Sequence, residues 1–297
     1  MKFDVIGIGM STVDNLFIVP KAPEFGQKCR AVDYSRQGGG PVATAMVALA
    51  RLGAKVSFIG KTGDDPDGDF IRDELLKEGV DVSHFITASG AKSRVVLVLV
   101  DQYSGDRCFI PRVETCSPLK IDELDKDFIT SARILHLDDA DEASIAAAKW
   151  AKEAGIRVVY DGSWYTKSAC ELLKLTDVAI VSKMFANEMA PGTPFTEVTQ
   201  RLFAVGAKIG IVTLGEKGCV VTHSAETFQY PAYHQIDVVD TTGAGDVFHG
   251  AFIYGMLQDW EVKKMVAFAS AAAALNCLKL GGRAGIPNLK EVIDFLS

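Results

Sequence analysis

The segment 238–248, Val-Val-Asp-Thr-Thr-Gly-Ala-Gly-Asp-Val-Phe, combines an acid with glycine-rich backbone where a strand is expected to meet a helix. The helix, predicted from Asp246 to residue 257, is apolar almost all round and should be buried. Its free N–H groups, which an anion can approach through Gly243, Ala244 and Gly245, form a cradle for a phosphoryl group. An acid there opposes simple anion binding, so Asp246 predicts a general base that takes a proton from a substrate hydroxyl. A helix-capping acid beside a tight glycine turn is the alternative that these residues leave open.

Two further glycine clusters indicate bare backbone that a ligand could approach. One lies between two predicted strands and consists of Thr213, Gly215 and Gly218. By itself this pattern is typical of a hairpin turn. The other, at residues 38–40, is a run of three glycines before a buried helix predicted over 42–52. A turn needs only one glycine, so close approach by a ligand is the better explanation for three.

From residue 121 onward, strands and helices alternate, which predicts a mainly parallel sheet with helices on both faces. The expected strands are 134–137, 157–160, 178–182, 209–214 and 219–222. The expected helices between them are 144–154, 165–173 and 195–205. The same α/β pattern extends toward the N-terminus with a strand over 3–8, the helix over 42–52, a strand over 55–59 and a helix over 67–77.

Two β-rich segments interrupt this pattern. Residues 12–36 hold short apolar or alternating pieces, one of them at 28–34, and residues 93–113 hold two pieces expected to form a β-hairpin. We predict that both segments assemble into one small β-sheet lid. The α/β core is then made of residues 1–11, 37–92 and 114–297. Because a small exposed sheet needs cover for its edge and face, the lid also predicts a homodimer.

Composition and charge exclude several classes of protein. The net charge is −7, from 31 basic and 38 acidic residues, so the overall field would attract neither nucleic acid nor an anionic membrane. The six cysteines form no Cys-x-x-Cys pair, and no apolar run approaches about 18 residues, which together predict a cytoplasmic protein. Gly60-Lys61-Thr62 lacks the upstream glycine of a P-loop because Lys55 stands there. Gly7-x-Gly9 lacks the third glycine of a dinucleotide fingerprint because Thr12 stands there.

Two longer motifs resemble the signatures of a known family. The run Asp-Thr-Thr-Gly-Ala-Gly-Asp at 240–246 is similar to the C-terminal signature of the ribokinase-like (PfkB) carbohydrate kinases. A second set of residues is similar to the N-terminal signature of the same family: Gly39-Gly40, Arg51-Leu52-Gly53, Gly60, Gly63-Asp64-Asp65 and Gly68. The resemblance covers essentially the whole chain. It implies a ribokinase-like three-layer α/β/α core with a small β-sheet lid, and phosphorylation of a sugar hydroxyl that depends on ATP and Mg²⁺.

On the nucleotide side, the resemblance assigns roles by position. Asp246 becomes the base, and the anion hole around it consists of Gly243, Ala244 and Gly245. The nucleotide loop is formed by Thr213, Gly215 and Gly218. The segment from Ala273 to Asn276 borders the adenine.

On the sugar side, Asp14 matches an acid that grips sugar hydroxyls, and the pocket is lined by Gly39 and Gly40. Thr44 stands where the family usually has a sugar-binding asparagine. Asp240 and Thr242, with the loop 281–285, match the monovalent-cation site that binds K⁺ in some members.

The chain departs from the family pattern in its metal motif and in its substrate residues. The Asn-x-x-Glu motif that organises the Mg²⁺ waters is replaced by Ser182-Lys183-Met184-Phe185, although Asn187-Glu188 follow. Sulfofructose kinases, a subgroup of the family, share Lys28, which faces the sulfonate, but their other two sulfonate contacts fall on Pro111 and Ala140. The acceptor therefore stays open among small sugars. A nucleoside kinase and a sugar or nucleotide sensor that has lost turnover are the alternatives.

Overall fold

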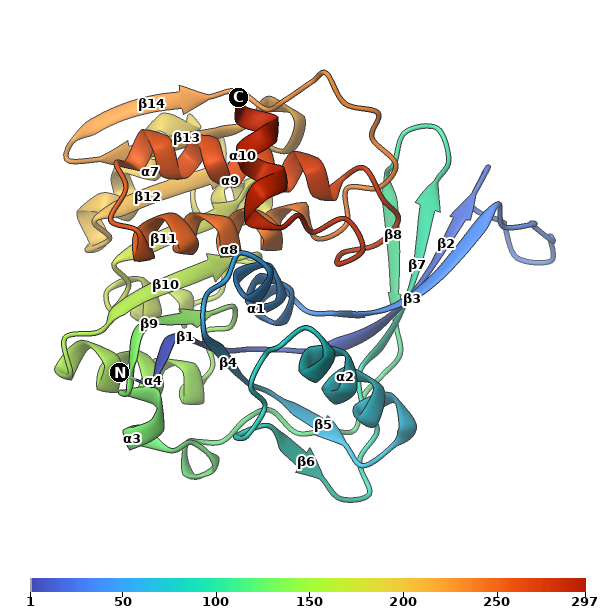
Figure 1. The fold of residues 1–297 in the computed structure, drawn as a ribbon, viewed down its shortest axis with the longest axis horizontal. Helices are drawn as coiled ribbons and strands as arrows, with labels where there is room; N and C mark the ends of the chain where they lie inside the picture. The colour runs from blue at the N-terminus through green and yellow to red at the C-terminus, as the bar shows by residue number, and fades with distance from the viewer. Residues whose placement is uncertain (1) are drawn as a thin grey trace.

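The large sheet of this protein is eight-stranded, in the order β14-β13-β12-β11-β10-β9-β1-β4 (Figure 1). The computed structural model describes residues 2–297. The strands β4, β1, β9, β10, β11 and β12 run parallel, whereas β13 and β14 pair antiparallel at one edge. Their bounds are β1 Phe3–Ile8, β4 Val56–Ile59, β9 Ala132–Leu137, β10 Arg157–Gly162, β11 Val178–Ser182, β12 Ile209–Thr213, β13 Cys219–His223 and β14 Glu226–Tyr230. The parallel strands are nearly continuous apolar runs because both of their faces are covered by helices.

Helices cover the two faces of the large sheet and enclose one apolar core on each side. One face carries α1 Pro41–Arg51, α2 Pro66–Lys77, α8 Ala244–Leu257, α9 Val262–Asn276 and α10 Leu289–Leu296. The other face carries α3 Lys126–Ile129, α4 Glu142–Glu153, α5 Ala169–Leu173, α6 Lys183–Met189 and α7 Phe195–Val205. Short 3₁₀ turns, η1 Ile121–Glu123 and η2 Gly215–Lys217, complete the connections. The layers are thus helix, sheet and helix. Within residues 2–297, no helix combines the length and apolar character needed to cross a lipid bilayer.

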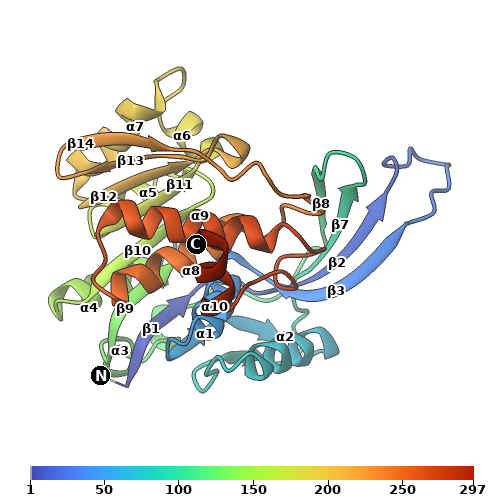
Figure 2. The same ribbon diagram turned by 45° about the horizontal axis from the view of Figure 1, so that its top comes forward.

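A second, four-stranded sheet projects from one side of this core (Figures 1 and 2). Its order is β3-β2-β7-β8, with β2 Thr12–Val19, β3 Asp33–Gly39, β7 Val95–Asp101 and β8 Arg107–Pro111. The strand β2 pairs antiparallel with β3 and parallel with β7, and β7 and β8 form an antiparallel hairpin. A two-stranded sheet of β5 Lys61–Gly63 and β6 Ile86–Ala88 lies beside α2.

The predicted α/β/α core with a mainly parallel sheet and an additional small sheet is confirmed. Two local predictions are wrong. The strand expected over 28–34 begins only at Asp33 and continues to Gly39 as β3. The helix expected over 165–173 is shortened to Ala169–Leu173, because Thr166 and Ser168 hydrogen-bond locally in the turn that precedes it. Seven helices and strands of the described residues were not predicted: β5, β6, β14, α3, α6, α9 and α10.

Candidate active site

The N-terminus of α8 is left open toward solvent. Gly243 is its N-cap, with a positive φ of 73°, and no side chain among the described residues caps it. A Cβ on Gly243 would lie 2.6 Å from the Cα of Gly282, so protein packing and backbone conformation both require glycine there. At Gly245 neither requirement holds, because its φ is not positive and a Cβ would meet no protein atom within 4 Å. The bare backbone at Gly245 therefore faces space that a ligand can fill.

Asp246 lies in the first turn of α8, beside these free N–H groups. Burial, and then the negative charges of Asp161 and Asp14, raise its pKa from 3.8 to about 7, against the guanidinium groups of Arg107 and Arg283. A carboxyl group with a pKa near neutrality can accept a proton from a hydroxyl and release it again at physiological pH. The geometry thus fits a general base better than a simple helix cap, because Asp246 caps no N–H group in the structure.

Asp14 projects from β2 on the face that carries Gln37 and Gly39 of β3. The hydroxyl of Thr12 donates to its Oδ1 at 2.7 Å. Burial raises the pKa of Asp14, while the Thr12 hydrogen bond and the charge of Arg283 act in the opposite direction. Because Asp14 and Asp246 lie close enough to affect each other's charge, the structure brings these two predicted site residues together.

The three successive glycines at 38–40 are each required by a neighbouring atom of the same chain. This corrects the expectation that close approach by a ligand explains them. A Cβ on Gly38 would lie 2.2 Å from Arg283 Nη1, and a Cβ on Gly39 would lie 2.1 Å from Asp14 Oδ2. Gly40 has a φ of 98°, and a Cβ there would lie 2.3 Å from the Met10 carbonyl oxygen. Each glycine therefore admits a neighbour from within the chain. The role of Gly39 and Gly40 in lining a sugar pocket stays a prediction.

The helix α1 that follows these glycines has an occupied N-terminus, unlike α8. Pro41 has no N–H, and Val42 N donates to Asp138 Oδ2 at 3.2 Å. Asp138 Oδ1 also accepts from Met10 N at 3.3 Å. Burial is the main cause that raises the pKa of Asp138 well above its ordinary value. An anion is thereby kept away from the start of α1.

The predicted nucleotide loop lies between β12 and β13. Thr213 ends β12, and Gly215 and Gly218 bracket the η2 turn with φ values of 62° and 79°. A Cβ on Gly218 would lie 2.0 Å from the Tyr230 carbonyl oxygen, so that glycine is needed for the turn. At Gly215 the surrounding space is open. This loop presents backbone at the carboxyl end of β12, where open α/β sheets bind ligands.

Ala273 and Asn276 lie in the last turn of α9 with different surroundings. Ala273 is partly exposed and can border a base. Asn276 is fully buried, and its Nδ2 donates to the Thr242 carbonyl oxygen at 3.0 Å. The expected nucleotide contact of Asn276 is therefore corrected: no atom of the residue is exposed, and its amide holds the segment that leads into α8.

Asp240 and Thr242, the predicted cation ligands, are hydrogen-bonded to each other. Asp240 Oδ1 accepts from both Thr242 N and Thr242 Oγ1 at 2.8 Å, and Oδ2 accepts from Gly281 N at 2.8 Å. These bonds account for the buried carboxylate without a cation. Its role as a K⁺ ligand stays a prediction.

Two predicted substrate contacts, Thr44 and Lys28, are not placed in the pocket. Thr44 is 1% exposed, and its hydroxyl accepts from Arg283 Nε at 3.3 Å, so the side chain is buried against that arginine. Lys28 lies in the exposed connection between β2 and β3, which forms the outer tip of the small sheet in both views (Figures 1 and 2). Two arginines near Lys28 and Pro111 in the sequence, Arg30 and Arg112, could also meet an anionic substrate group. Arg30 is exposed in the same connection. Arg112 is engaged by Asp65, Asp67 and the Ser93 carbonyl oxygen.

The structure adds residues that the sequence analysis missed or placed elsewhere. Asp161 is the next-to-last residue of β10, and burial raises its pKa to about 7. His249, one turn after Asp246 on α8, places Nε2 3.4 Å from Asp161 Oδ2. Arg107 on β8 and Arg283 act on the charge of Asp246. An acid at a predicted strand end is a usable signal for Asp161, whereas the two arginines have no local signal.

The residues present could hold Mg²⁺ with only a few protein ligands. Among residues 2–297, no group of three or more His, Cys, Asp or Glu side chains forms a ready-made metal site. Of the residues beyond the replaced motif, Asn187 is exposed and Glu188 accepts from Tyr165 N at 2.9 Å. Lys183, within the replaced motif, is also exposed. Mg²⁺ in kinases commonly binds one or two carboxylates, several waters and the substrate phosphates. Asp161, a buried carboxyl group whose pKa is about 7, would be the carboxylate for that arrangement.

Comparisons with known proteins agree with this geometry. A family model described as pfkB family carbohydrate kinase matches residues 4–289. The ribokinase of Lactococcus lactis is 31% identical over 297 residues, covering 98% of this chain and 95% of that protein. A 5-dehydro-2-deoxygluconokinase of Shouchella clausii is 28% identical over 316 residues, covering 98% and 94%. The structure of Arabidopsis thaliana ribokinase complexed with ribose and ATP superposes with a TM-score of 0.85 at 25% identity, covering 100% of this chain and 99% of that one. The chain belongs to the PfkB family of carbohydrate kinases.

Proposed function

We propose that this carbohydrate kinase transfers the γ-phosphoryl group of ATP to a hydroxyl of a small sugar, with Asp246 as the general base. The observation that carries the proposal is the juxtaposition of the Asp246 carboxyl, whose pKa is about 7, with the uncapped N-terminus of α8. Asp246 takes the hydroxyl proton as the oxygen attacks the γ-phosphorus in line. The N–H groups at Gly245 and its neighbours stabilise the charge on the transferred group.

ATP and Mg²⁺ are the cofactors that the site supports. The Arabidopsis relative is described as complexed with ATP, and the backbone of Thr213, Gly215 and Gly218 offers a matching place for a nucleotide here. Bound Mg²⁺ would neutralise the charge on the phosphates. Asp161 would hold its hydration shell. A K⁺ ion near Asp240 is a further proposal, because its buried carboxylate has a lone pair left on Oδ2.

On the acceptor side, we assign Asp14 to sugar hydroxyls and the backbone of Gly39 and Gly40 to the pocket wall. The four-stranded sheet carries Asp14 and Arg107, so its movement toward the core would close the pocket over both ligands. Closure of this kind excludes water, which would otherwise compete with the sugar for the phosphoryl group.

A coupled assay of ADP release tests the proposed activity. The acceptors are D-ribose, D-fructose and 5-dehydro-2-deoxy-D-gluconate, with adenosine and inosine as nucleosides, each added with Mg²⁺ and ATP. We expect at least one sugar to accelerate ADP release well above the rate in water alone. Release driven only by a nucleoside would make the protein a nucleoside kinase. ATP binding without release for any acceptor would support a sensor.

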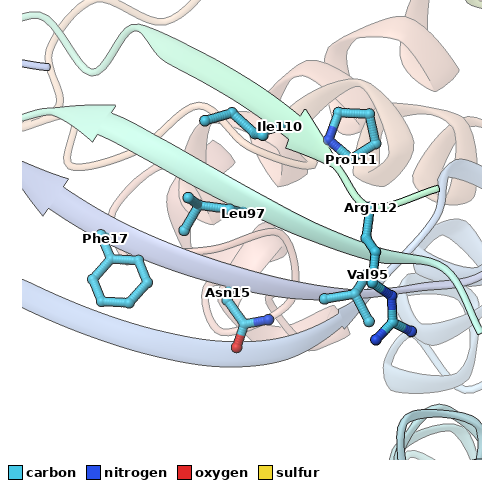
Figure 3. A pocket seen from close by; sticks show the side chains of 7 residues that line it. All are labelled: Asn15, Phe17, Val95, Leu97, Ile110, Pro111 and Arg112. Carbon is cyan, nitrogen blue, oxygen red and sulfur yellow. The ribbon is translucent and has the colours of Figure 1, made fainter. Parts of the chain in front are cut away.

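The outer face of the four-stranded sheet supports a homodimer. Phe17, Val95, Leu97 and Ile110 share the face opposite Asp14. Together with Asn15, Pro111 and Arg112 they line a hollow of about 420 Å³. Figure 3 shows these seven side chains. Ile110 is 49% exposed. An apolar sheet face of this kind in a stable protein calls for a partner, and we propose a second copy of the chain.

Sedimentation measures this association directly. We expect the wild-type protein at micromolar concentration to have twice the 32.0 kDa mass of one chain. Ile110→Glu should shift it toward the monomer, because a carboxylate in the apolar contact is costly to desolvate. Val113→Glu is the matched control, since Val113 is 86% exposed outside the hollow. A monomeric wild-type protein would disprove the dimer.

A further inference from the structure

The loop of residues 280–285, here called the Gly281 loop, connects α9 to α10 and contacts the backbone that opens α8. Gly281 N donates to Asp240 Oδ2, and Asp240 Oδ1 accepts from Thr242 N, both at 2.8 Å. Gly282 lies directly against Gly243, where no Cβ would fit. The Gly281 loop therefore holds the segment that places the free N–H groups of α8.

The same loop is held from the opposite side by Gln37 of β3. Gln37 Oε1 accepts from Arg283 N at 3.1 Å and from Ala284 N at 3.2 Å, and Nε2 donates to the Leu280 carbonyl oxygen at 2.8 Å. Gln37 is 8% exposed and pairs with Asp14 across the β2–β3 ladder. One buried amide thus joins the strand beside the sugar-binding acid to both ends of the Gly281 loop.

Arg283 adds a second connection from this loop to the sugar side. Its Nη2 donates to the Gly39 carbonyl oxygen at 3.0 Å, and its Nε donates to Thr44 Oγ1 at 3.3 Å. The side chain is 3% exposed, and its Nη1 has no hydrogen-bond partner among the described residues. Burying a charged group with an unpaired donor is unfavourable. If Arg283 served only to pack against Gly39 and Thr44, a neutral side chain could do so without that cost. In Figure 1 the red segment between α9 and α10 reaches the base of the four-stranded sheet.

We propose that Gln37 and Arg283 are positioning residues that couple the sugar half of the site to the anion hole through the Gly281 loop. This proposal rests on the proposed function, because it uses the anion hole at Gly243–Gly245. A nucleotide that orders the start of α8 orders the Gly281 loop, and through Gln37 it orders β3 beside Asp14. By linkage, a sugar bound at Asp14 strengthens nucleotide binding by the same factor.

Hydrogen–deuterium exchange on the full chain tests this coupling without a known sugar. The probe is Mg²⁺ with AMP-PNP, a slowly hydrolysed ATP analogue, added to the wild-type protein, Gln37→Met and Arg283→Lys. In the wild type we expect amide exchange to slow at residues 241–247 and also, by about tenfold, at 33–40. In both variants, protection at 241–247 should remain while protection at 33–40 falls below about twofold. Arg36→Met is the matched control on β3, because Arg36 pairs with Asp67 and does not contact the Gly281 loop.

The outcomes separate the coupling from the nucleotide site itself. Protection of 33–40 that persists in both Gln37→Met and Arg283→Lys, or that is absent from the wild type, overturns the coupling while leaving the nucleotide site intact. Loss of this protection in Arg36→Met also overturns it, because any disturbance of β3 would then suffice. Absence of protection at 241–247 in the wild type removes the proposed anion hole and the coupling together. Arg283→Lys retains the charge and serves as the second variant if Gln37→Met does not fold.

Discussion

Replacing Asp246 with asparagine is expected to lower kcat by about 10²–10⁴-fold, the usual contribution of a general base. The amide keeps the size and polarity of the side chain but cannot accept the hydroxyl proton. ATP affinity should change little, because Asp246 caps no N–H group at the start of α8. Steady-state ADP release with the best sugar of the panel measures the loss. Asp237→Asn makes the same chemical change at an exposed position before α8 and should leave kcat unaltered.

The raised pKa of Asp246 gives this prediction a dependence on pH. The base acts in its deprotonated form, so the kcat/KM of the wild type should rise with pH and level off above about 7. Between 3.8 and about 7, the folded protein retains a proton that the unfolded chain has released, so the free energy of unfolding attributable to this group falls as pH rises. Asp246→Asn should therefore unfold at a higher temperature than the wild type at pH 8, and the difference should shrink toward pH 4. Wild-type turnover in Asp246→Asn would rule out the base assignment.

Gly245→Val is expected to remove activity without destabilising the protein. A Cβ at Gly245 meets no protein atom and the backbone φ is not positive, so the fold accommodates valine. The added side chain fills the space where the γ-phosphoryl group must approach the N–H groups. Loss of an oxyanion contact alone costs about 10²–10³ in kcat, and steric exclusion adds to that.

Gly243 supplies the matched comparison for Gly245. Gly243→Val places a β-branched side chain at a φ of 73° and against the backbone of Gly282, so it should be destabilised by about 1–3 kcal/mol or more. Thermal unfolding and ADP release, measured together, separate the two effects. If Gly245→Val phosphorylates its sugar at the wild-type rate, the open end of α8 is not the anion hole.

The elements of the core could be predicted because their signals are local. The apolar runs of β1, β11 and β12 identify buried strands without knowledge of their neighbours. The helix α9 was left unassigned because it is apolar on almost every side, with alanine at most positions from 269 to 274, and shows no clear period.

The candidate site was only partly predictable, because glycine does not reveal what it makes room for. At Gly245 the neighbour is open space, whereas at Gly38 it is the guanidinium of Arg283, which lies in the C-terminal part of the chain. Thr44 was assigned to the sugar by its place in a motif, yet its hydroxyl holds that same arginine. Contacts between residues so distant in sequence follow from the way the sheets pack, and no local pattern encodes them.

The helices α1 and α8 both begin after glycines, but their N-termini differ in whether an anion can bind there. Asp138 occupies the first available N–H of α1, while the start of α8 has no side chain upon it. In the proposed mechanism a triphosphate would therefore be seated at the start of α8 and the acceptor on the other side. A chain whose net charge is −7 can accommodate a polyanion through local attraction at that end. The polarity of phosphoryl transfer would thus be set before either ligand binds.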